Sequence, residues 1–440
     1  MKKLKIILTL IMALILLCSC GQGAKTTEDA TDASKSDAFD KPSMSVDASP
    51  SDVGDVDEAE YSEADDGAPA TGAAEAADGA PSVNGAVEEK DIAAGTLTAG
   101  EWKDNDNYDF WLNVLARDGW KEFSELWKVQ LTKRLVFTVT SGQNPIKNAK
   151  VIVMDSENAP ISEAYTDSYG KAYVYYDVAN EGKNPAKYHI TSDYIADDVA
   201  EFTPITDAQI SAGGIDVDVS GWGYFNDLPQ YRNLDIMFTT DTTGSMSDEL
   251  EYLKKELTNV ITRAADENES YDIRVSVNFY RDEGDEYVVR DFAFSGDIDE
   301  VQRQIDVQFS DGGGDYPEAV HTALRNSIHD HEWRADAIKI LFLTLDARGH
   351  SEVDGVVEDI RASVVEAASR GIRIVPIASS GVDTETEFML RMMACVSGGT
   401  YTFLTDHSGV GDAHLEPTIG DYNVKMLNDL LVKIISEYCK

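Results

Sequence analysis

The chain has 440 residues, of which 42% are hydrophobic, enough for two or three domains with buried cores. Acidic side chains outnumber basic ones 80 to 37, and the formal net charge is −43. Such a charge repels phosphate backbones, which excludes nucleic acid as a partner and leaves cationic, metal-bridged or neutral partners.

The N-terminus has the features of an export signal. Lysines at positions 2, 3 and 5 precede an apolar run at 6–17, which is too short to span a bilayer securely. The run ends in Leu17-Cys18-Ser19-Cys20, which resembles the lipobox of bacterial lipoproteins. This resemblance implies a signal peptide at 1–19, acylation of Cys20, and an extracytoplasmic protein anchored by lipid to the cell membrane. An ordinary cleaved signal peptide is the alternative, and the type of cell envelope stays open.

Residues 20–95 have the composition of a disordered acidic linker. Between 21 and 94 there are 19 acidic and 4 basic side chains and almost no bulky apolar ones. Such a segment cannot bury enough surface to offset the entropy of ordering it, and its charges repel one another. We expect a stalk that acts as a tether, with a plain spacer as the simpler alternative to a specific binding role.

Residues 96–132 are rich in aromatic side chains and hold four of the six tryptophans. Rings of this size usually bury themselves against neighbouring elements, which predicts a helical strap that packs on another domain. A platform for carbohydrate is the alternative.

Residues 133–220 have the pattern of an all-β sandwich. Short β-rich runs at 135–140, 149–154, 171–176 and 188–191 are separated by turn residues. The stretches Asn-Ala-Lys-Val-Ile-Val from 148 and Thr-Asp-Ser-Tyr-Gly-Lys from 166 resemble carboxypeptidase-regulatory-like or Ig-like modules of secreted proteins. These modules are usually spacers, and no catalytic constellation is visible in this region.

Residues 225–440 alternate between apolar runs and amphipathic stretches, which predicts an α/β domain with an open sheet and helices on both faces. The predicted strands are 234–241, 272–279, 287–294, 338–344, 372–377 and 401–404. The predicted helices are 250–261, 298–307, 317–328, 356–368, 388–395 and 426–438. The second and third of these strands are expected to form a hairpin at the edge of the sheet.

Polar side chains follow the first of these strands. Asp241, Thr243 and Ser245 lie where open α/β sheets bind ligands, beyond the carboxyl end of a buried strand. An oxygen-only set with one carboxylate suits a hard cation such as Mg²⁺. In the alternative without metal, Ser245 caps the following helix and Asp241 merely ends the strand.

Asp241-Thr242-Thr243-Gly244-Ser245 resembles the Asp-x-Ser/Thr-x-Ser signature of the von Willebrand factor A (VWA) domain. This family has a Rossmann-like fold and binds partners through a divalent cation at a metal-ion-dependent adhesion site (MIDAS). The resemblance implies that Thr243 and Ser245 ligate the metal directly and Asp241 largely through water. The order of elements in 225–440 is similar to the family's. The Leu-Thr-Ala-Gly-Glu-Trp run at 97–102 resembles a segment seen ahead of VWA domains in bacterial surface proteins.

Two further loops complete the site that this resemblance implies. Asp346 follows the strand predicted at 338–344 and matches the aspartate of the third loop. In the second loop, where many family members have threonine, a glycine-rich stretch leads to Asp315. Asp315 is the natural replacement ligand, although it could also sit in the turn without touching metal. A third carboxylate would favour Ca²⁺ alongside Mg²⁺ and would make the metal less electrophilic toward a carboxylate of a partner.

Other polar groups in 225–440 leave alternatives open. A second metal site would draw on Asp406, His407, Asp412 and His414, which otherwise are loop side chains near the far edge of the sheet. His350 could approach the first site or lie exposed in a loop. Cys395 and Cys439 could form a disulfide or be buried separately.

These features favour a lipid-anchored protein of the cell surface that binds a protein partner through Mg²⁺ or Ca²⁺. An enzyme would need a nucleophile with a nearby base or a paired acid and base, and no hydrolase, zinc-protease, Walker or dinucleotide signature occurs. We therefore expect no catalytic residues and no enzyme activity. The alternatives are an envelope-assembly scaffold with a purely structural metal site and a metal-assisted hydrolase.

Overall fold

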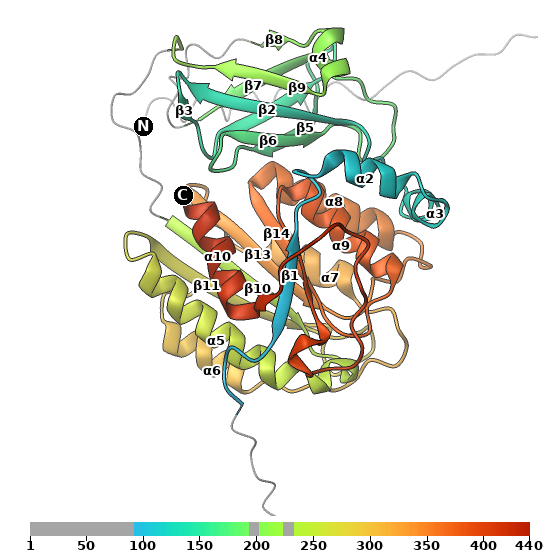
Figure 1. The fold of residues 1–440 in the computed structure, drawn as a ribbon, viewed down its shortest axis with the longest axis vertical. Coiled ribbons are helices and arrows are strands. Elements are labelled where there is room, and N and C mark those ends of the chain that lie inside the picture. Colours follow the sequence, from blue (N-terminus) through green and yellow to red (C-terminus); the bar gives the residue numbers. More distant parts are fainter. Residues whose placement is uncertain (1–91, 193–201, 223–232) are drawn as a thin grey trace, which may run out of the picture. The chain divides into compact units, whose positions relative to one another are not determined.

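The computed structural model describes residues 92–192, 202–222 and 233–440, all within the compact unit formed by residues 86–440. The predicted signal peptide, including the site at Cys20, lies outside the described residues, as does the predicted linker up to residue 91. The described chain contains one eight-stranded sheet with helices and two four-stranded sheets (Figure 1).

The eight-stranded sheet has the order β12-β11-β10-β13-β14-β15-β1-β16. Strands β10, β11, β13, β14 and β15 run parallel, whereas β12, β1 and β16 pair antiparallel with their neighbours. The bounds are β1 Thr98–Trp102, β10 Asn233–Asp241, β11 Asp272–Tyr280, β12 Val289–Arg290, β13 Ala337–Leu345, β14 Ile372–Ala378, β15 Tyr401–Leu404 and β16 Lys425–Met426. The predicted edge hairpin is thus present, with a second strand of only two residues.

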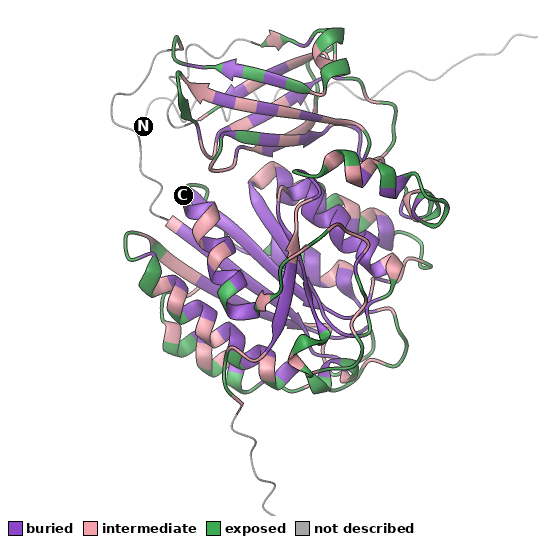
Figure 2. Cartoon of the chain, in the orientation of Figure 1, coloured by how far each residue is buried: buried purple, intermediate pink, exposed green. Residues whose placement is uncertain are grey.

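Strands β10 and β13 form the centre of the sheet, and their apolar runs are buried on both faces (Figure 2). Burial on both faces is the reason these strands read as continuous hydrophobic runs rather than as alternating patterns. The parallel register pairs Thr240 with Thr344, so the carboxyl ends of the two strands lie level with each other. This arrangement confirms the predicted α/β sheet and brings the loops after β10 and β13 to one edge.

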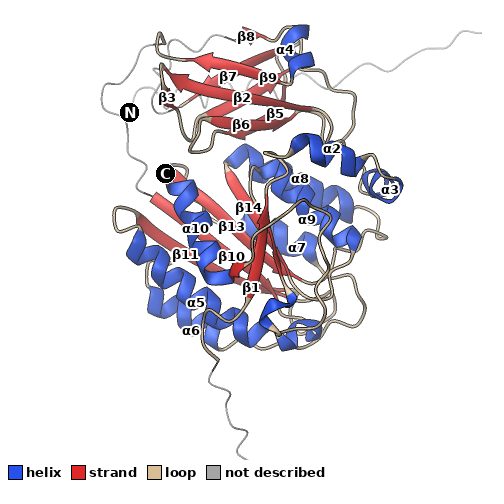
Figure 3. Ribbon diagram, in the orientation of Figure 1, coloured by secondary structure: helices blue, strands red, loops and turns tan. Residues whose placement is uncertain are grey.

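Helices cover both faces of the sheet (Figure 3). One hydrophobic core joins the sheet to α5, α6 and α10, and another joins the opposite face to α7, α8 and α9. The bounds are α5 Leu250–Glu267, α6 Ile298–Asp306, α7 Val320–Arg325, α8 Val356–Arg370, α9 Thr384–Ser397 and α10 Leu427–Cys439. A short 3-10 helix at Gly244–Asp248 precedes α5, a π-helical turn at Asn326–Asp330 follows α7, and a second 3-10 turn spans Asp406–Ser408.

The beginning of the aromatic strap is a strand of the large sheet, β1. β1 lies between β15 and β16 and pairs antiparallel with both. The buried carboxylate of Glu256, on α5, accepts hydrogen bonds of 2.8–3.1 Å from the backbone N–H groups of Gly95, Thr96 and Leu97. The sheet therefore extends beyond the predicted boundary at residue 225 and includes a strand from the 96–132 segment.

The aromatic side chains of the strap pack inward. Trp111, Trp120 and Trp127 are buried in α2 Tyr108–Leu115, in α3 Asp118–Leu126 and just after α3, and the rings of Trp120 and Phe388 of α9 lie 6.0 Å apart. These tryptophans therefore follow the packing interpretation, and they offer no exposed platform for carbohydrate.

A buried ion-pair network holds the strap to α9. Arg391 is fully buried and donates hydrogen bonds of 2.8 and 2.6 Å to the two carboxylate oxygens of Asp104, which lies just after β1. It also donates to Glu387 at 2.9 Å and to the carbonyl oxygen of Thr418 at 2.8 Å. The guanidinium lies 4.3 Å from the ring centre of Trp111, so its charge is both paired and stacked.

The described residues between 134 and 218 form two four-stranded sheets around one apolar core. One sheet contains β2 Arg134–Ser141, β3 Asn144–Pro145, β6 Lys171–Tyr175 and β9 Gly214–Asp218. The other contains β4 Lys150–Met154, β5 Pro160–Tyr165, β7 Lys187–Thr191 and β8 Thr203–Pro204. A single-turn helix, α4 Asp207–Ala212, leads into β9. The four predicted β-rich runs correspond to β2, β4, β6 and β7.

The described helices and the two cysteines of the α/β domain bear on the sequence predictions about membranes and disulfides. Within the described ranges, no helix combines the length and apolar character needed to cross a membrane. Cys395 and Cys439 are both buried and both free, so the described chain contains no bond between them.

Candidate metal site

The first loop of the candidate site starts from Asp241, the last residue of β10. Its side chain is fully buried, and its Oδ1 accepts hydrogen bonds from the backbone N–H of Thr243 at 2.9 Å and from the hydroxyl of Thr243 at 2.7 Å. The hydroxyls of Thr243 and Ser245 lie 3.2 Å apart. The loop thus orders three oxygen-bearing side chains at the carboxyl end of the central strand.

The third loop brings Asp346 to the same place. Asp346 directly follows β13, the parallel neighbour of β10, and its side chain is nearly fully buried. Burial raises the pKa of Asp346 to about 6, and the hydroxyl of Ser245 partly offsets this rise. Burial and then the charge of Asp346 raise the pKa of Asp241 to about 7. The charge of Asp346 thus disfavours the ionisation of Asp241.

Buried carboxylate oxygens without partners mark this edge of the sheet. Within the described ranges, no hydrogen bond of good geometry reaches Oδ2 of Asp241 or Oδ1 of Asp346, although the buried hydroxyl of Tyr280 lies near enough to Asp241 to lower its pKa. An unpaired buried carboxylate oxygen is costly, because burial removes its water and nothing replaces it. A cation would satisfy both oxygens and would remove the repulsion between the two carboxylates.

The second loop crosses close to the first. The N–H of Gly244 donates to the carbonyl oxygen of Gly312 at 3.1 Å, and Gly312 and Gly313 both have positive φ angles, +79° and +72°. A Cβ on Gly313 would lie 3.3 Å from Cβ of Thr243. Only glycine allows both the backbone conformation and this close approach. Asp315, the predicted ligand from this loop, is exposed to solvent.

The buried carboxylate beside the second loop is Glu318, which the sequence interpretation did not single out. It is 2% exposed, its Oε2 has no hydrogen-bond partner in the described chain, and its Oε1 lies 3.2 Å from the Cβ position of Gly313. Burial, followed by the charges of Asp241 and Asp282, raises the pKa of Glu318 to about 10. The only sequence signal for it is an acidic residue directly after Pro317, a pattern that ordinarily marks the start of a helix.

Comparison with known families agrees with this architecture. The model of the von Willebrand factor type A domain matches residues 235–414, which begin within β10 and contain all three loops. Residues 235–414 form a VWA domain. The predicted fold class, a VWA-type sheet with helices on both faces, is therefore confirmed.

Other comparisons add little to this assignment. A solved structure described as the conserved hypothetical protein BatB from Bacteroides thetaiotaomicron matches with 14% sequence identity and a TM-score of 0.32, covering 46% of this chain and 96% of that one. A search among curated proteins gave no match.

The predicted metal ligands include hydroxyl oxygens. In the residues that the structure describes, no group of three or more His, Cys, Asp or Glu side chains is arranged to hold a metal ion. The predicted set is of another kind, because it combines the hydroxyls of Thr243 and Ser245 with carboxylates. That chemistry suits Mg²⁺ or Ca²⁺, which take oxygen ligands and retain water.

Two histidines of the VWA domain, His350 and His414, pair with carboxylates outside the predicted set. His350 lies 2.8 Å from Asp282 and 3.0 Å from Glu352. His414 lies 2.9 Å from Glu249 and 2.8 Å from Asp406. Burial alone would lower the pKa of His414, but these two carboxylates raise it above the ordinary value.

The four residues weighed as a second metal site are only partly together. Asp406 and His414 contact each other, whereas His407 and Asp412 are exposed. A buried histidine between two carboxylates is satisfied by ion pairing and needs no metal.

Proposed function

We propose that the VWA domain binds a protein partner through Mg²⁺ or Ca²⁺. The ligands would be Asp241, Thr243, Ser245 and Asp346, together with a carboxylate from the second loop. The observation that carries the proposal is the pair of buried, unpartnered oxygens on Asp241 and Asp346 beside two ordered hydroxyls. VWA domains in general serve protein interaction, which supports a binding role over catalysis.

The second-loop ligand would be either Asp315 or Glu318. Burial favours Glu318, because its side chain is enclosed and one of its oxygens is unpartnered, while Asp315 faces solvent. With Glu318 bound, three carboxylates would surround a doubly charged ion. The metal would then attract a partner's carboxylate weakly, and other contacts at the loops would have to contribute to the affinity.

A matched pair of variants separates these two ligands. We expect Glu318→Gln to lower the affinity for Mg²⁺ or Ca²⁺ about tenfold or more, because it removes a ligand charge while keeping the side-chain shape. Asp315→Asn should change the affinity less than about threefold, because an exposed charge is screened by solvent. Isothermal titration calorimetry on the full chain measures both. The reverse order of effects would assign the ligand to Asp315.

The alternatives differ from partner binding in a measurable way. A scaffold with a structural metal keeps its partner only while the fold is intact, and a metal-assisted hydrolase needs a substrate bond to cleave. If the metal bridges the partner, immobilised protein should capture envelope proteins in Mg²⁺ and release them when a chelator is added. The circular dichroism spectrum should stay unchanged, which shows that the fold is intact. Capture that persists in chelator, or that is equal for the Asp241→Ala variant, would contradict the metal-bridged function.

We also propose that Cys20 is acylated, that the mature protein is anchored extracytoplasmically in the cell membrane, and that residues 133–220 act as an Ig-like spacer. The lipobox-like run before Cys20 supports the anchor. Acylation at Cys20 would have to supply two lipid chains, or one chain with a second signal, because a single chain binds a membrane only weakly. We expect Cys20→Ala to move the protein into the soluble fraction or to leave it unprocessed. Fractionation followed by mass spectrometry of the N-terminus measures this. Normal membrane association of a cleanly cleaved Cys20→Ala protein would contradict the anchor.

A further inference from the structure

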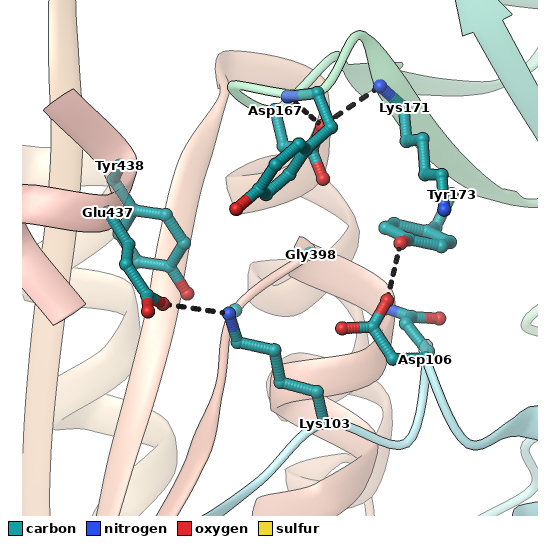
Figure 4. A pocket seen from close by; sticks show the side chains of 11 residues that line it. Lys103, Asp106, Asp167, Lys171, Tyr173, Gly398, Glu437 and Tyr438 are labelled. Atoms are coloured by element: carbon teal, nitrogen blue, oxygen red, sulfur yellow. Dashed lines mark hydrogen bonds and ion pairs between the residues drawn. The ribbon is translucent and has the colours of Figure 1, made fainter. Parts of the chain in front are cut away.

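A cavity of about 520 Å³ lies beside the turn that follows β1, and none of its lining residues belongs to the three loops of the metal site (Figure 4). One part of its wall is the turn at 103–106. A second part is the β5–β6 turn with the start of β6, and the third is formed by the C-terminal ends of α9 and α10. The size is typical of cavities that hold a small organic ligand.

The charged groups of this cavity are of both signs, because two lysines and three carboxylates line it. Lys103 lies 3.2 Å from Glu437, and the hydroxyl of Tyr173 donates to Asp106 at 2.9 Å (Figure 4). Asp167 Oδ1 accepts two backbone N–H groups, those of Tyr169 at 2.8 Å and Lys171 at 2.9 Å. Because lysines and carboxylates both line the wall and neither sign of charge dominates, the wall favours a ligand without net charge.

Hydrogen-bonding groups nevertheless remain available around the cavity. Within the described ranges, the side-chain amine of Lys171 and Oδ2 of Asp167 have no partner. One can donate and the other can accept, and Asp106 adds a further exposed carboxylate. Hydroxyl groups suit such a mixed wall, because each can act as donor or acceptor.

Aromatic rings supply the apolar part of the wall. Tyr169 is 66% exposed although its ring is large, and Tyr173, four residues later, is half-buried. Tyr438 forms part of the wall at α10. A tyrosine ring offers an apolar face together with a polar edge. The complementary ligand has apolar C–H faces and a rim of hydroxyls.

We propose that this cavity binds an uncharged saccharide. The rings of Tyr169 and Tyr173 stack on its C–H faces, and Asp167, Lys171 and Asp106 hydrogen-bond with its hydroxyls. Because the β-sandwich and the ends of α9 and α10 all contribute to the wall, the saccharide contacts each of them and stabilises the protein when it binds. This site is independent of the metal.

Binding of cellotetraose, chitotetraose and a panel of immobilised neutral oligosaccharides to the full chain tests the proposal. We expect at least one of them to bind, and Tyr169→Ala to weaken that binding about tenfold. Tyr169→Phe should bind nearly as well as the wild type, because it keeps the ring. Phe202→Ala is the matched control, because Phe202 is also exposed, at 54%, and lies outside the cavity.

Each other outcome overturns the proposal. Absence of binding across the panel shows that the cavity takes no neutral saccharide. Equal binding by wild type and Tyr169→Ala, with Tyr169→Ala folded by circular dichroism, places any saccharide elsewhere. Binding of the uncharged peptide N-acetyl-trialanine amide in competition with every sugar assigns the cavity to peptides instead. Chelator in all buffers keeps the metal site from contributing.

Discussion

The Asp241→Asn variant should no longer respond to divalent cations and should be more stable than the wild type in their absence. Mg²⁺ or Ca²⁺ at about 100 times its dissociation constant should stabilise the wild type by about 2.7 kcal/mol, because it binds only the folded chain. Asparagine keeps an oxygen that can accept the hydrogen bond from Thr243. It removes the negative charge that attracts the cation and repels Asp346. Without cation, removing this buried charge should raise the free energy of unfolding by about 2 to 4 kcal/mol at pH 8.

The pH dependence follows from the direction of the pKa shifts. The pKa values of Asp241 and Asp346 rise from 3.8 to about 7 and about 6 on folding. The folded chain therefore holds protons that the unfolded chain has released, and the associated stability is present below pH 4 and lost as pH rises through 6 and 7. The melting temperature of the cation-free wild type should fall over this window, and Asp241→Asn should flatten the fall.

Differential scanning fluorimetry at pH 5 and pH 8, with chelator, Mg²⁺ or Ca²⁺, measures these effects. Asp311→Asn is the control, because its side chain is 72% exposed and close to the second loop. It should behave as the wild type. A wild-type melting temperature that no divalent cation changes would defeat the metal site, and a cation response retained in Asp241→Asn would remove Asp241 from it.

Arg391→Met should destabilise the protein by about 3–5 kcal/mol. The substitution preserves much of the side-chain volume, but it leaves Asp104 and Glu387 buried without their cation. It also frees the strap, since Asp104 follows β1 and Trp111 stacks on the guanidinium. Urea denaturation followed by tryptophan fluorescence measures the loss.

Arg263→Met is the matched control, because Arg263 forms ion pairs with Glu267 and Asp429 on the surface, with a third of its side chain exposed. We expect a change below about 1 kcal/mol there. Similar losses in both variants would mean that the Arg391 network adds no more than a surface ion pair. The double variant Arg391→Met with Asp104→Asn should recover part of the stability, because it removes one of the stranded charges.

Several features of the fold were readable from local patterns. The apolar runs of β10 and β13 require burial on both faces, and only a sheet between two helical layers provides that. Asp241, Thr243 and Ser245 are two residues apart in one loop, so their proximity follows from the chain itself. Asp346 could be added because parallel strands bring their carboxyl ends to one edge of the sheet.

The sequence by itself determined most helices and strands of the α/β domain, its sheet type, and which four of the five ligand candidates close spacing or strand order places together. Only the tertiary structure decided that β1 joins this sheet. The backbone groups at the edge of β15 can pair with any short extended segment, so the side chains of β1 do not predict this pairing. The tertiary structure also decided that Glu318 rather than Asp315 is the buried carboxylate of the second loop. Residue type alone predicts that Glu318 and Asp315 are both exposed. Which of the two is buried depends on the distant segments that enclose it.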